Sequence, residues 1–267
     1  MTDPIAEFKT KQRETWALGN FGDMAVFSTI VAGHLVRFAE VVAGQRVLDV
    51  ATGTGVVAIT AARLGATVSG LDLTPELLDQ ARKSASIAGL RGIDWKEGDA
   101  ESLPYPDASF DVVLSEFGHM FAPRPDVVVK EMLRVLKPSG RLAFGTWPPE
   151  QFIGRSFALA ARYVPPPPGV PSPVLWGEVS TVRERLGSAV KDLFFERGVM
   201  GFPTLSPQHY IAFQTAKLGP FIRTVGALQK DPSKLEAYLK ESADLVASYT
   251  VDNVVRHEYL LTRAMKV

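Results

Sequence analysis

Short apolar runs alternate with amphipathic stretches between residues 46 and 147, and this alternation predicts an α/β domain. The apolar runs have the length of buried strands and lie at 46–50, 67–71, 92–96, 110–115 and 141–147. The amphipathic stretches have helical spacing and lie at 55–64, 75–88 and 126–137. Strands and helices in regular alternation predict a parallel sheet with right-handed crossovers. Thr74, followed by Pro75, and Asp126 are expected to cap two of these helices.

The segments on either side of this region follow other patterns. Residues 4–42 predict two helices broken around the Gly-Asn-Phe-Gly-Asp segment at 19–23, so residues 1–43 should form a helical cover. Residues 148–177 contain the run Pro165 to Pro168 and several further prolines. We expect this segment to be a stiff, extended loop on the substrate side of the domain.

The last third of the chain predicts a hairpin interrupted by helices. A short helix at 179–187 and a strand at 191–199 come first, and residues 254–265 have the character of an antiparallel edge strand. Between these strands, residues 206–248 are helical in pattern. We therefore predict a sheet domain over 44–205 and 249–267, with 206–248 inserted as a lid; a dimer surface or an extension of the core are the alternatives.

Composition excludes several classes of function. The 267 residues are 46% hydrophobic and 22% charged, with 29 basic and 29 acidic side chains. Such a balance gives no field that would attract nucleic acid or an anionic membrane. The chain has no cysteine, which excludes disulfides and thiolate metal sites, and we expect no metal. The N-terminus has no apolar signal region and 24–43 is too polar for a membrane span, so we expect a cytoplasmic monomer or homodimer.

Three acidic residues follow three successive predicted strands. Asp49 ends the first strand, just before the turn Ala51-Thr-Gly-Thr-Gly55, Asp72 ends the second and Asp99 follows the third. The turn glycines allow a ligand to approach the backbone, and the helix that follows offers free N–H groups. An acid after the second strand is placed to accept hydrogen bonds from ribose hydroxyls. The arrangement predicts an adenosine site.

Two cofactors compete for this site. Gly53-Thr-Gly-Val-Val-Ala58 fits the glycine pattern of nicotinamide-dependent oxidoreductases, and Asp72 lies near the expected distance of ~20 residues. A pyrophosphate, however, would be repelled by a carboxylate beside the turn. Asp49 suits instead the ammonium and sulfonium groups of S-adenosylmethionine. The charge pattern therefore favours S-adenosylmethionine over NAD.

Residues 44–149 resemble the cofactor domain of class I S-adenosylmethionine-dependent methyltransferases, in particular the branch with the ubiquinone/menaquinone-biosynthesis C-methyltransferases. The resemblance rests on VLDVATGTG at 47–55, GLDLTPELL at 70–78, EGDAESLPYPDASFDVVLS at 97–115 and EMLRVLKPSGRLAFGTW at 131–147. Two departures are Ala51 and Ser139, each in place of a common glycine. The resemblance implies a doubly wound, Rossmann-like, mostly parallel seven-stranded sheet with an antiparallel last strand, and N-terminal helices that fold over the cofactor.

The resemblance also implies a role for each matching residue. Asp49 would face the methionine portion of the cofactor, together with the backbone of Ala51, Thr52, Gly53, Thr54, Gly55 and Ser115. Asp72 would accept from the ribose hydroxyls and Asp99 from the adenine amino group, with Leu73 and Ala100 flanking the base.

The residues that act on the methyl acceptor are less well specified. His119 and Glu116 follow the fourth strand and are candidates for a general base, with a structural histidine and a surface carboxylate as the alternatives. The other histidines are expected to be structural or on the surface: His34, His209 and His257. Six aromatic residues could line an acceptor pocket, although any of them could instead pack in the core: Phe21, Phe117, Phe121, Trp147, Tyr163 and Trp176.

The sequence thus favours a methyltransferase that acts on O, N or C of a small organic acceptor. A nicotinamide-dependent oxidoreductase and a cofactor-binding but non-catalytic partner subunit remain as alternatives. An RNA or protein substrate is less favoured because the chain has no basic stripe.

Overall fold

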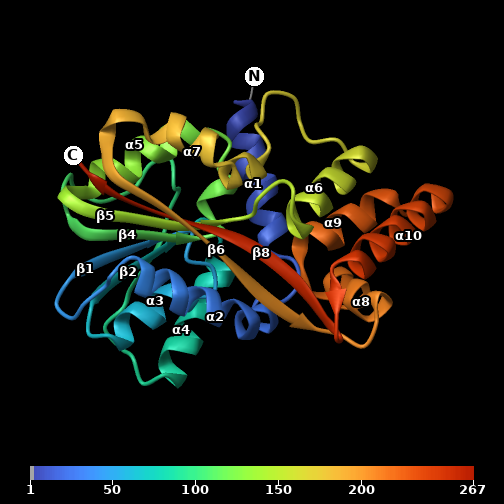
Figure 1. Ribbon diagram of the computed structural model, residues 1–267, viewed down its shortest axis with the longest axis horizontal. Coiled ribbons are helices and arrows are strands. Elements are labelled where there is room, and N and C mark those ends of the chain that lie inside the picture. Colours follow the sequence, from blue (N-terminus) through green and yellow to red (C-terminus); the bar gives the residue numbers. More distant parts are fainter. Residues whose placement is uncertain (1–2) are drawn as a thin grey trace.

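The computed structural model describes residues 3–267 and contains one mixed sheet with helices on both faces (Figure 1). The strands follow the order β3-β2-β1-β4-β5-β8-β6, with the two-residue β7 (Thr250–Val251) paired to β8. Four neighbouring pairs are parallel, and β8 is antiparallel to both of its main partners. The predicted mostly parallel sheet with an antiparallel end is confirmed.

The parallel half of the sheet matches the predicted alternation of strands and helices. Its strands are β1 (Arg46–Val50), β2 (Thr67–Asp72), β3 (Asp94–Glu97), β4 (Phe110–Glu116) and β5 (Leu136–Thr146). The crossover helices are α3 (Val56–Arg63), α4 (Pro75–Ile87) and α5 (Pro125–Val135). Because parallel strands end at one edge of a sheet, the residues after β1, β2, β3 and β4 meet there.

The N-terminal helices lie where the glycine-rich break predicts them. They are α1 (Pro4–Ala17), whose first turn is capped by the Asp3 carboxylate, and α2 (Gly22–Phe38). Apolar residues of α2 pack on the sheet, whereas α1 has no buried residue among those described and contacts α9 and α4. Because Lys9 of α1 forms an ion pair with Asp99, which follows β3, helix α1 lies over the carboxyl end of that strand.

The expected caps within the sheet domain need correction. Thr74 occupies the cap position of α4, but its side chain makes no capping hydrogen bond within the described chain. Arg124, and not Asp126, occupies the cap position of α5, without a side-chain capping hydrogen bond, because Pro125 takes the first helical position and Asp126 falls in the first turn. The negative charge of Asp126 still stabilises this positive helix end.

The strand at the end of the chain is not the edge strand that the sequence predicts. β8 (Val254–Lys266) pairs with β5 on one side and with β6 (Val190–Pro203) on the other. Most residues of β8 from 255 to 264 are buried, whereas β6 is exposed along much of its length. The edge strand is therefore β6. An interior strand is covered on both faces, so the more buried β8 takes that position.

The proline-rich segment 148–177 is only partly the extended loop that was expected. Helix α6 (Phe152–Tyr163) fills its first half and a 3-10 turn, η2, spans Pro173–Gly177. Residues 152–163 contain no proline and have an amphipathic pattern, so they form a helix despite the prolines that follow. The extended part is confined to about residues 164–172.

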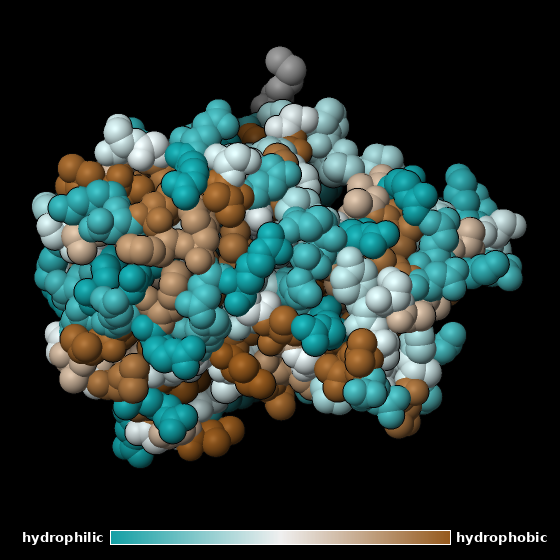
Figure 2. All heavy atoms as spheres, in the orientation of Figure 1, coloured by the Kyte–Doolittle hydropathy of each residue, from teal (hydrophilic) through white to brown (hydrophobic). Residues whose placement is uncertain are grey.

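The helical insertion forms a second layer beside the sheet. It contains α8 (Pro207–Lys217), α9 (Gly219–Leu228) and α10 (Pro232–Ser248), and α6 packs against α10 (Figure 1). The short α7 (Val179–Leu186) instead packs beside α5. Hydrophilic residues separate several smaller hydrophobic patches on the face shown in Figure 2. None of the helices in residues 3–267 is both long and apolar enough to span a membrane.

Candidate active site

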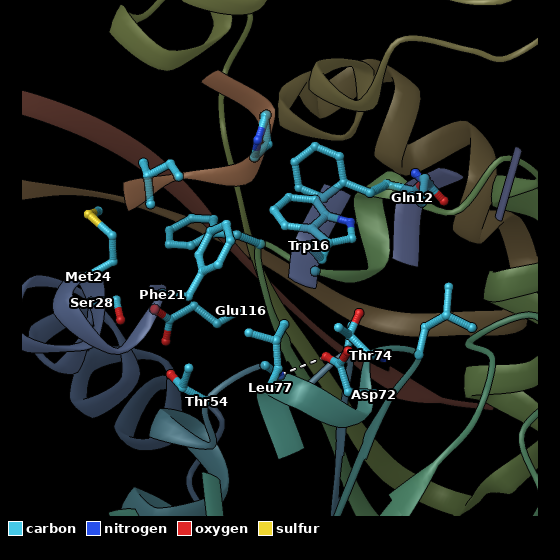
Figure 3. Close-up of a pocket in the computed structure, with 18 of the residues that line it drawn as sticks. Gln12, Trp16, Phe21, Met24, Ser28, Thr54, Asp72, Thr74, Leu77 and Glu116 are labelled. Carbon is cyan, nitrogen blue, oxygen red and sulfur yellow. Dashed lines mark hydrogen bonds between the residues drawn. The ribbon is translucent and has the colours of Figure 1, made fainter. Parts of the chain in front are cut away.

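A cavity with about 380 Å³ of internal space opens at the carboxyl ends of the parallel strands. Its floor comes from the segments that follow β1, β2, β3 and β4. Its walls come from α1, α2, α6 and the inserted helices α8 to α10, so segments from both ends of the chain enclose it. Figure 3 shows Trp16, Phe21 and Glu116 pointing into the same space from different elements.

The turn after β1 gives the cavity floor its shape. Ala51, Gly53 and Gly55 all have positive φ angles, of 55°, 54° and 84°. A Cβ atom at Gly55 would lie 2.7 Å from the Trp95 ring, so only glycine fits there. Ala51, the departure from the common glycine, adopts the left-handed conformation without a glycine's freedom. The tight turn brings the backbone of 51–54 to the cavity surface.

Asp49 lies beneath this turn and is only 1% exposed. Its Oδ2 accepts hydrogen bonds from Thr52 Oγ1 at 2.5 Å and from the backbone N–H of Ala58 at 3.1 Å. Its Oδ1 has no protein partner among the described residues. Burial, opposed by these hydrogen bonds, raises the pKa of Asp49 to about 7. A cation bound in the cavity would lower the pKa of Asp49 again and so favour its ionised carboxylate.

Asp72 is held at the tip of β2 by two backbone donors. Its carboxylate accepts from the N–H of Gly53 and from the N–H of Thr74, each at 2.8 Å. Burial raises the pKa of Asp72 above its usual value, and the hydrogen bonds from Thr74 and Gly53 oppose this shift. The carboxylate therefore joins the turn after β1 to the loop after β2 and also faces the cavity.

Asp99 lies in an ion-pair network that the sequence did not indicate. Lys9 of α1 reaches both Asp99 and Glu101, with Nζ–O distances of 2.5 Å. Arg124 binds the same Glu101 side chain, which is completely buried. The backbone N–H of Glu101 also donates to Asp99 Oδ1 at 2.9 Å. This network fastens α1 over the cavity at the end where Asp99 lies.

Two of the predicted cofactor residues, Gly55 and Ser115, lie behind the cavity wall, whereas the rest line it: Asp49, Ala51, Thr52, Gly53, Thr54, Asp72, Leu73, Asp99 and Ala100. Ser115 Oγ donates to the Val50 carbonyl at 2.7 Å and accepts from the N–H of His119 at 3.1 Å. Ser115 thus links the end of β4 to the end of β1 by hydrogen bonds and lies beneath the cavity floor.

The two candidate bases lie in different places. Glu116 lines the cavity, and its Oε2 is buried without a partner within residues 3–267. Burial first, and then the nearby Asp49 charge, raises the pKa of Glu116 well above its usual range. Burial therefore favours the neutral form of the Glu116 carboxyl group over the ionised form.

His119 is outside the cavity, contrary to its prediction as a base. Its ring lies 4.7 Å from both the Phe144 and Trp176 rings, and the residue is 1% exposed. Burial, together with the charge of Arg185, lowers the pKa of His119 to about 3. The 3-10 turn after β4 carries His119 toward η2 and α7, so its ring packs in the core and cannot reach an acceptor in the cavity.

Four of the six predicted pocket aromatics line the cavity: Phe21, Phe117, Phe121 and Trp147. Phe117 and Trp147 stack with a centroid distance of 3.7 Å and an interplanar angle of 11°. Tyr163 instead donates to Glu241 at 2.6 Å, and Trp176 is buried under the Arg185 guanidinium. Both lie outside the cavity wall, because α6 turns Tyr163 toward α10 and η2 packs against the turn after β4.

Several cavity residues were not predicted. Further apolar side chains come from helices and from the junction of α8 and α9, whose inward faces could not be assigned by sequence alone: Trp16, Met24, Phe157, Leu218 and Phe221. Two buried polar residues, Gln214 of α8 and His257 of β8, also line the cavity. His257 was expected to be structural or on the surface, and its immediate neighbours, Arg256 and Glu258, gave no signal that it would line a cavity. No cluster of three His, Asp or Glu side chains suited to a metal occurs in the part of the chain described.

Comparisons with known proteins agree with this geometry. The methyltransferase domain family matches residues 48–144. An uncharacterised protein of Mycobacterium tuberculosis is 36% identical over 270 residues, covering 96% of this chain and 94% of the relative. A demethylmenaquinone methyltransferase of Deinococcus radiodurans is 44% identical over 126 residues, covering 46% of this chain and 52% of that enzyme. The crystal structure of the YcgJ protein from Bacillus subtilis aligns with a TM-score of 0.62 at 21% identity, covering 88% and 97%.

Proposed function

Because this chain belongs to the class I S-adenosylmethionine-dependent methyltransferases, we propose that it transfers the methyl group of S-adenosylmethionine to a small organic acceptor. The observation that carries this proposal is the lining of the cavity, which combines carboxylates from successive strand ends with several aromatic side chains. The carboxylates suit a cationic nucleoside, and the aromatic side chains suit an apolar acceptor.

The residues at the strand ends fit the cofactor chemically. The free Oδ1 of Asp49 and the free Oε2 of Glu116 are buried acceptors that a cationic amino-acid tail would satisfy. We assign Asp72 to the ribose hydroxyls and Asp99 to the adenine amino group, because both residues line the cavity. The backbone at Gly53 has open space above it, since a Cβ there would meet nothing within 4 Å of it among the described residues.

The cofactor supplies a methyl group on a sulfonium, which an acceptor atom displaces in line. The protein contributes by position and by exclusion of water, because such a displacement needs the two reacting atoms ~3–3.5 Å apart and aligned. Phe117 and Trp147 would form the wall that holds the acceptor beside this point. Glu116 is the candidate to take a proton from the acceptor, because it is the carboxylate at the end of β4 and lines the cavity.

We further propose that residues 206–248 act as a lid. Gln214, Leu218, Phe221 and Tyr238 from this segment all line the cavity. A ligand that fills the cavity should therefore slow amide exchange in α8 and α9. Unchanged exchange in both helices with S-adenosylhomocysteine and an acceptor bound would contradict this role.

Calorimetric titration tests the cofactor. S-adenosylmethionine and S-adenosylhomocysteine should bind, and NADH should bind more weakly than either, because its pyrophosphate would meet Asp49 and Asp72. Absence of binding at millimolar S-adenosylmethionine would reject the proposal, and tighter binding of NADH would favour an oxidoreductase. Transfer of a labelled methyl group to an acceptor panel then separates an enzyme from a non-catalytic cofactor-binding subunit. We place the reaction in the cytoplasm, on the sequence evidence alone.

A further inference from the structure

The carboxylate assigned to the adenine amino group is already held by groups of the protein. Oδ1 of Asp99 accepts from the backbone N–H of Glu101 at 2.9 Å, and Oδ2 lies 2.5 Å from Nζ of Lys9. Lys9 and Asp99 both line the cavity, so their ion pair belongs to its wall. A base that approaches Asp99 from the cavity therefore meets a carboxylate that is paired with an ammonium group.

Lys9 has a second partner that does not line the cavity. Its Nζ also lies 2.5 Å from Oε2 of Glu101, whose side chain is completely buried. Arg124 binds the same oxygen at 2.6 Å, and its backbone N–H donates to the other carboxylate oxygen at 2.7 Å. Lys9 can therefore leave Asp99 and still keep a carboxylate partner, so its ammonium group has two stable positions.

An ammonium group and an adenine amino group compete unequally for one carboxylate. Both partners of the bond between Lys9 and Asp99 are charged, and such bonds are about twice as strong as bonds between neutral groups. The adenine amino group is neutral, and the nearby ammonium group offsets the charge that would attract it. Full contact between adenine and Asp99 thus requires that Lys9 withdraws from Oδ2.

Helix α1 can allow this withdrawal because no buried face holds it near Lys9. None of the described residues of α1 is buried. Its aromatic anchor is Trp16, whose ring lies 4.8 Å from that of Phe121, but this residue is near the other end of the helix, two turns beyond Lys9. Segments with few buried apolar contacts open locally at low cost in free energy. Movement of Lys9 therefore leaves the core packing intact.

We propose that Lys9 is an intramolecular competitor of the cofactor, which holds Asp99 until the adenine base binds and then pairs with Glu101 alone. The N-terminal part of α1 is then a latch over the adenine end of the cavity, and the ion pair with Asp99 lowers cofactor affinity. This inference rests on the proposed function, and in particular on the assignment of Asp99 to the adenine amino group.

Two ligands with the same ribose and amino-acid tail test the inference by calorimetric titration. S-inosylhomocysteine carries a carbonyl oxygen where S-adenosylhomocysteine carries the amino group. Lys9→Met should bind S-adenosylhomocysteine about tenfold more tightly than the wild type does, because one charge-assisted competitor is removed. Its affinity for S-inosylhomocysteine should not rise, since the carbonyl oxygen would face the freed carboxylate of Asp99.

Two control variants isolate the charge at position 9. Lys11→Met removes an exposed lysine of the same helix, whose partner is Glu7, and should leave both affinities at their wild-type values. Lys9→Arg keeps the positive charge beside Asp99. Its ratio of S-adenosylhomocysteine affinity to S-inosylhomocysteine affinity should therefore not rise above that of the wild type.

A purely supporting role of Lys9 predicts the opposite sign, because loss of the ion pairs would loosen α1 and weaken both ligands. Equal or weaker binding of S-adenosylhomocysteine by Lys9→Met, or an equal gain for both ligands, would overturn the inference. Lys9→Gln also removes the charge but keeps a polar side chain, and it replaces Lys9→Met should that variant not fold, with the same outcomes. Failure of the wild-type protein to bind S-adenosylhomocysteine would instead reject the function itself.

Discussion

Replacement of Asp49 by asparagine should stabilise the protein and weaken cofactor binding at the same time. The pKa of Asp49 is raised from 3.8 to about 7 in the folded protein, mainly by burial. Because the folded pKa lies above the unfolded value, the carboxyl group ionises more easily in the unfolded chain. The wild-type protein therefore loses stability as the pH rises from about 4 through 7, and asparagine removes this loss.

The size of the effect follows from that shift. At 1.36 kcal/mol for each pH unit, the free energy of unfolding of Asp49→Asn should exceed that of the wild type by about 2 kcal/mol at pH 5 and by about 4 kcal/mol at pH 8. An asparagine oxygen can still accept from Thr52 Oγ1 and from the N–H of Ala58, so the local structure should persist. Affinity for S-adenosylmethionine should fall about ten- to hundredfold, since a charge-assisted contact is lost.

Urea unfolding between pH 5 and 8, with calorimetric titration of the cofactor, measures both effects. The difference between variant and wild type is the useful quantity, because titration of buried histidines cancels in it. Asp244→Asn, an exposed position on α10, serves as the matched control and should change neither property. A variant that is less stable than the wild type at pH 8, or that binds the cofactor with wild-type affinity, would refute the assignment of Asp49 as a buried carboxylate kept for a cation.

Three further variants test the site. Gly118→Ala should lower cofactor affinity at least about tenfold, because the new Cβ would lie 2.5 Å from that of Ala51 and displace the turn. Gly92→Ala, which has open space around the new Cβ, is the control. Equal cofactor affinities of the two variants in calorimetry would contradict the role of the turn. Gly55→Ala should destabilise the fold by about 3 kcal/mol in urea, since it combines strain at φ 84° with overpacking, and a loss below about 1 kcal/mol would argue against this geometry of the turn. His119→Phe should leave cofactor binding and methyl transfer within about twofold. Because the pKa of His119 is lowered to about 3, the free energy of unfolding of the wild type falls as the pH drops below 6.5. Between pH 7 and pH 5, the variant should lose about 2 kcal/mol less of this free energy than the wild type. Loss of methyl transfer in a variant that still folds would restore His119 as the base.

The order of strands and helices from residue 46 to residue 135 followed from the sequence because its causes are local. Side-chain periodicity, proline at the first helical position and glycine in tight turns act within a few residues. Helix α6 was missed because the prolines at 165–168 dominated the composition of its segment, although they lie outside the helix. The place of β8 between β5 and β6 depends on strand pairing over long distances along the chain, which local patterns do not encode.

The candidate site was also predictable from the sequence only in part. Asp49, Asp72 and Asp99 could be placed together in advance, because the ends of successive parallel strands meet at one edge whatever the details of packing. Which histidine faces the cavity could not: His119 follows a strand tip but turns into the core, whereas His257 lies in a strand far along the chain and lines the cavity. The sequence by itself determined, through backbone topology, that these three carboxylates meet at one edge of the sheet. The tertiary structure alone decided which side chains complete the rest of the cavity wall, because the inward faces of α1, α6, α8 and β8 depend on how these distant elements pack against one another.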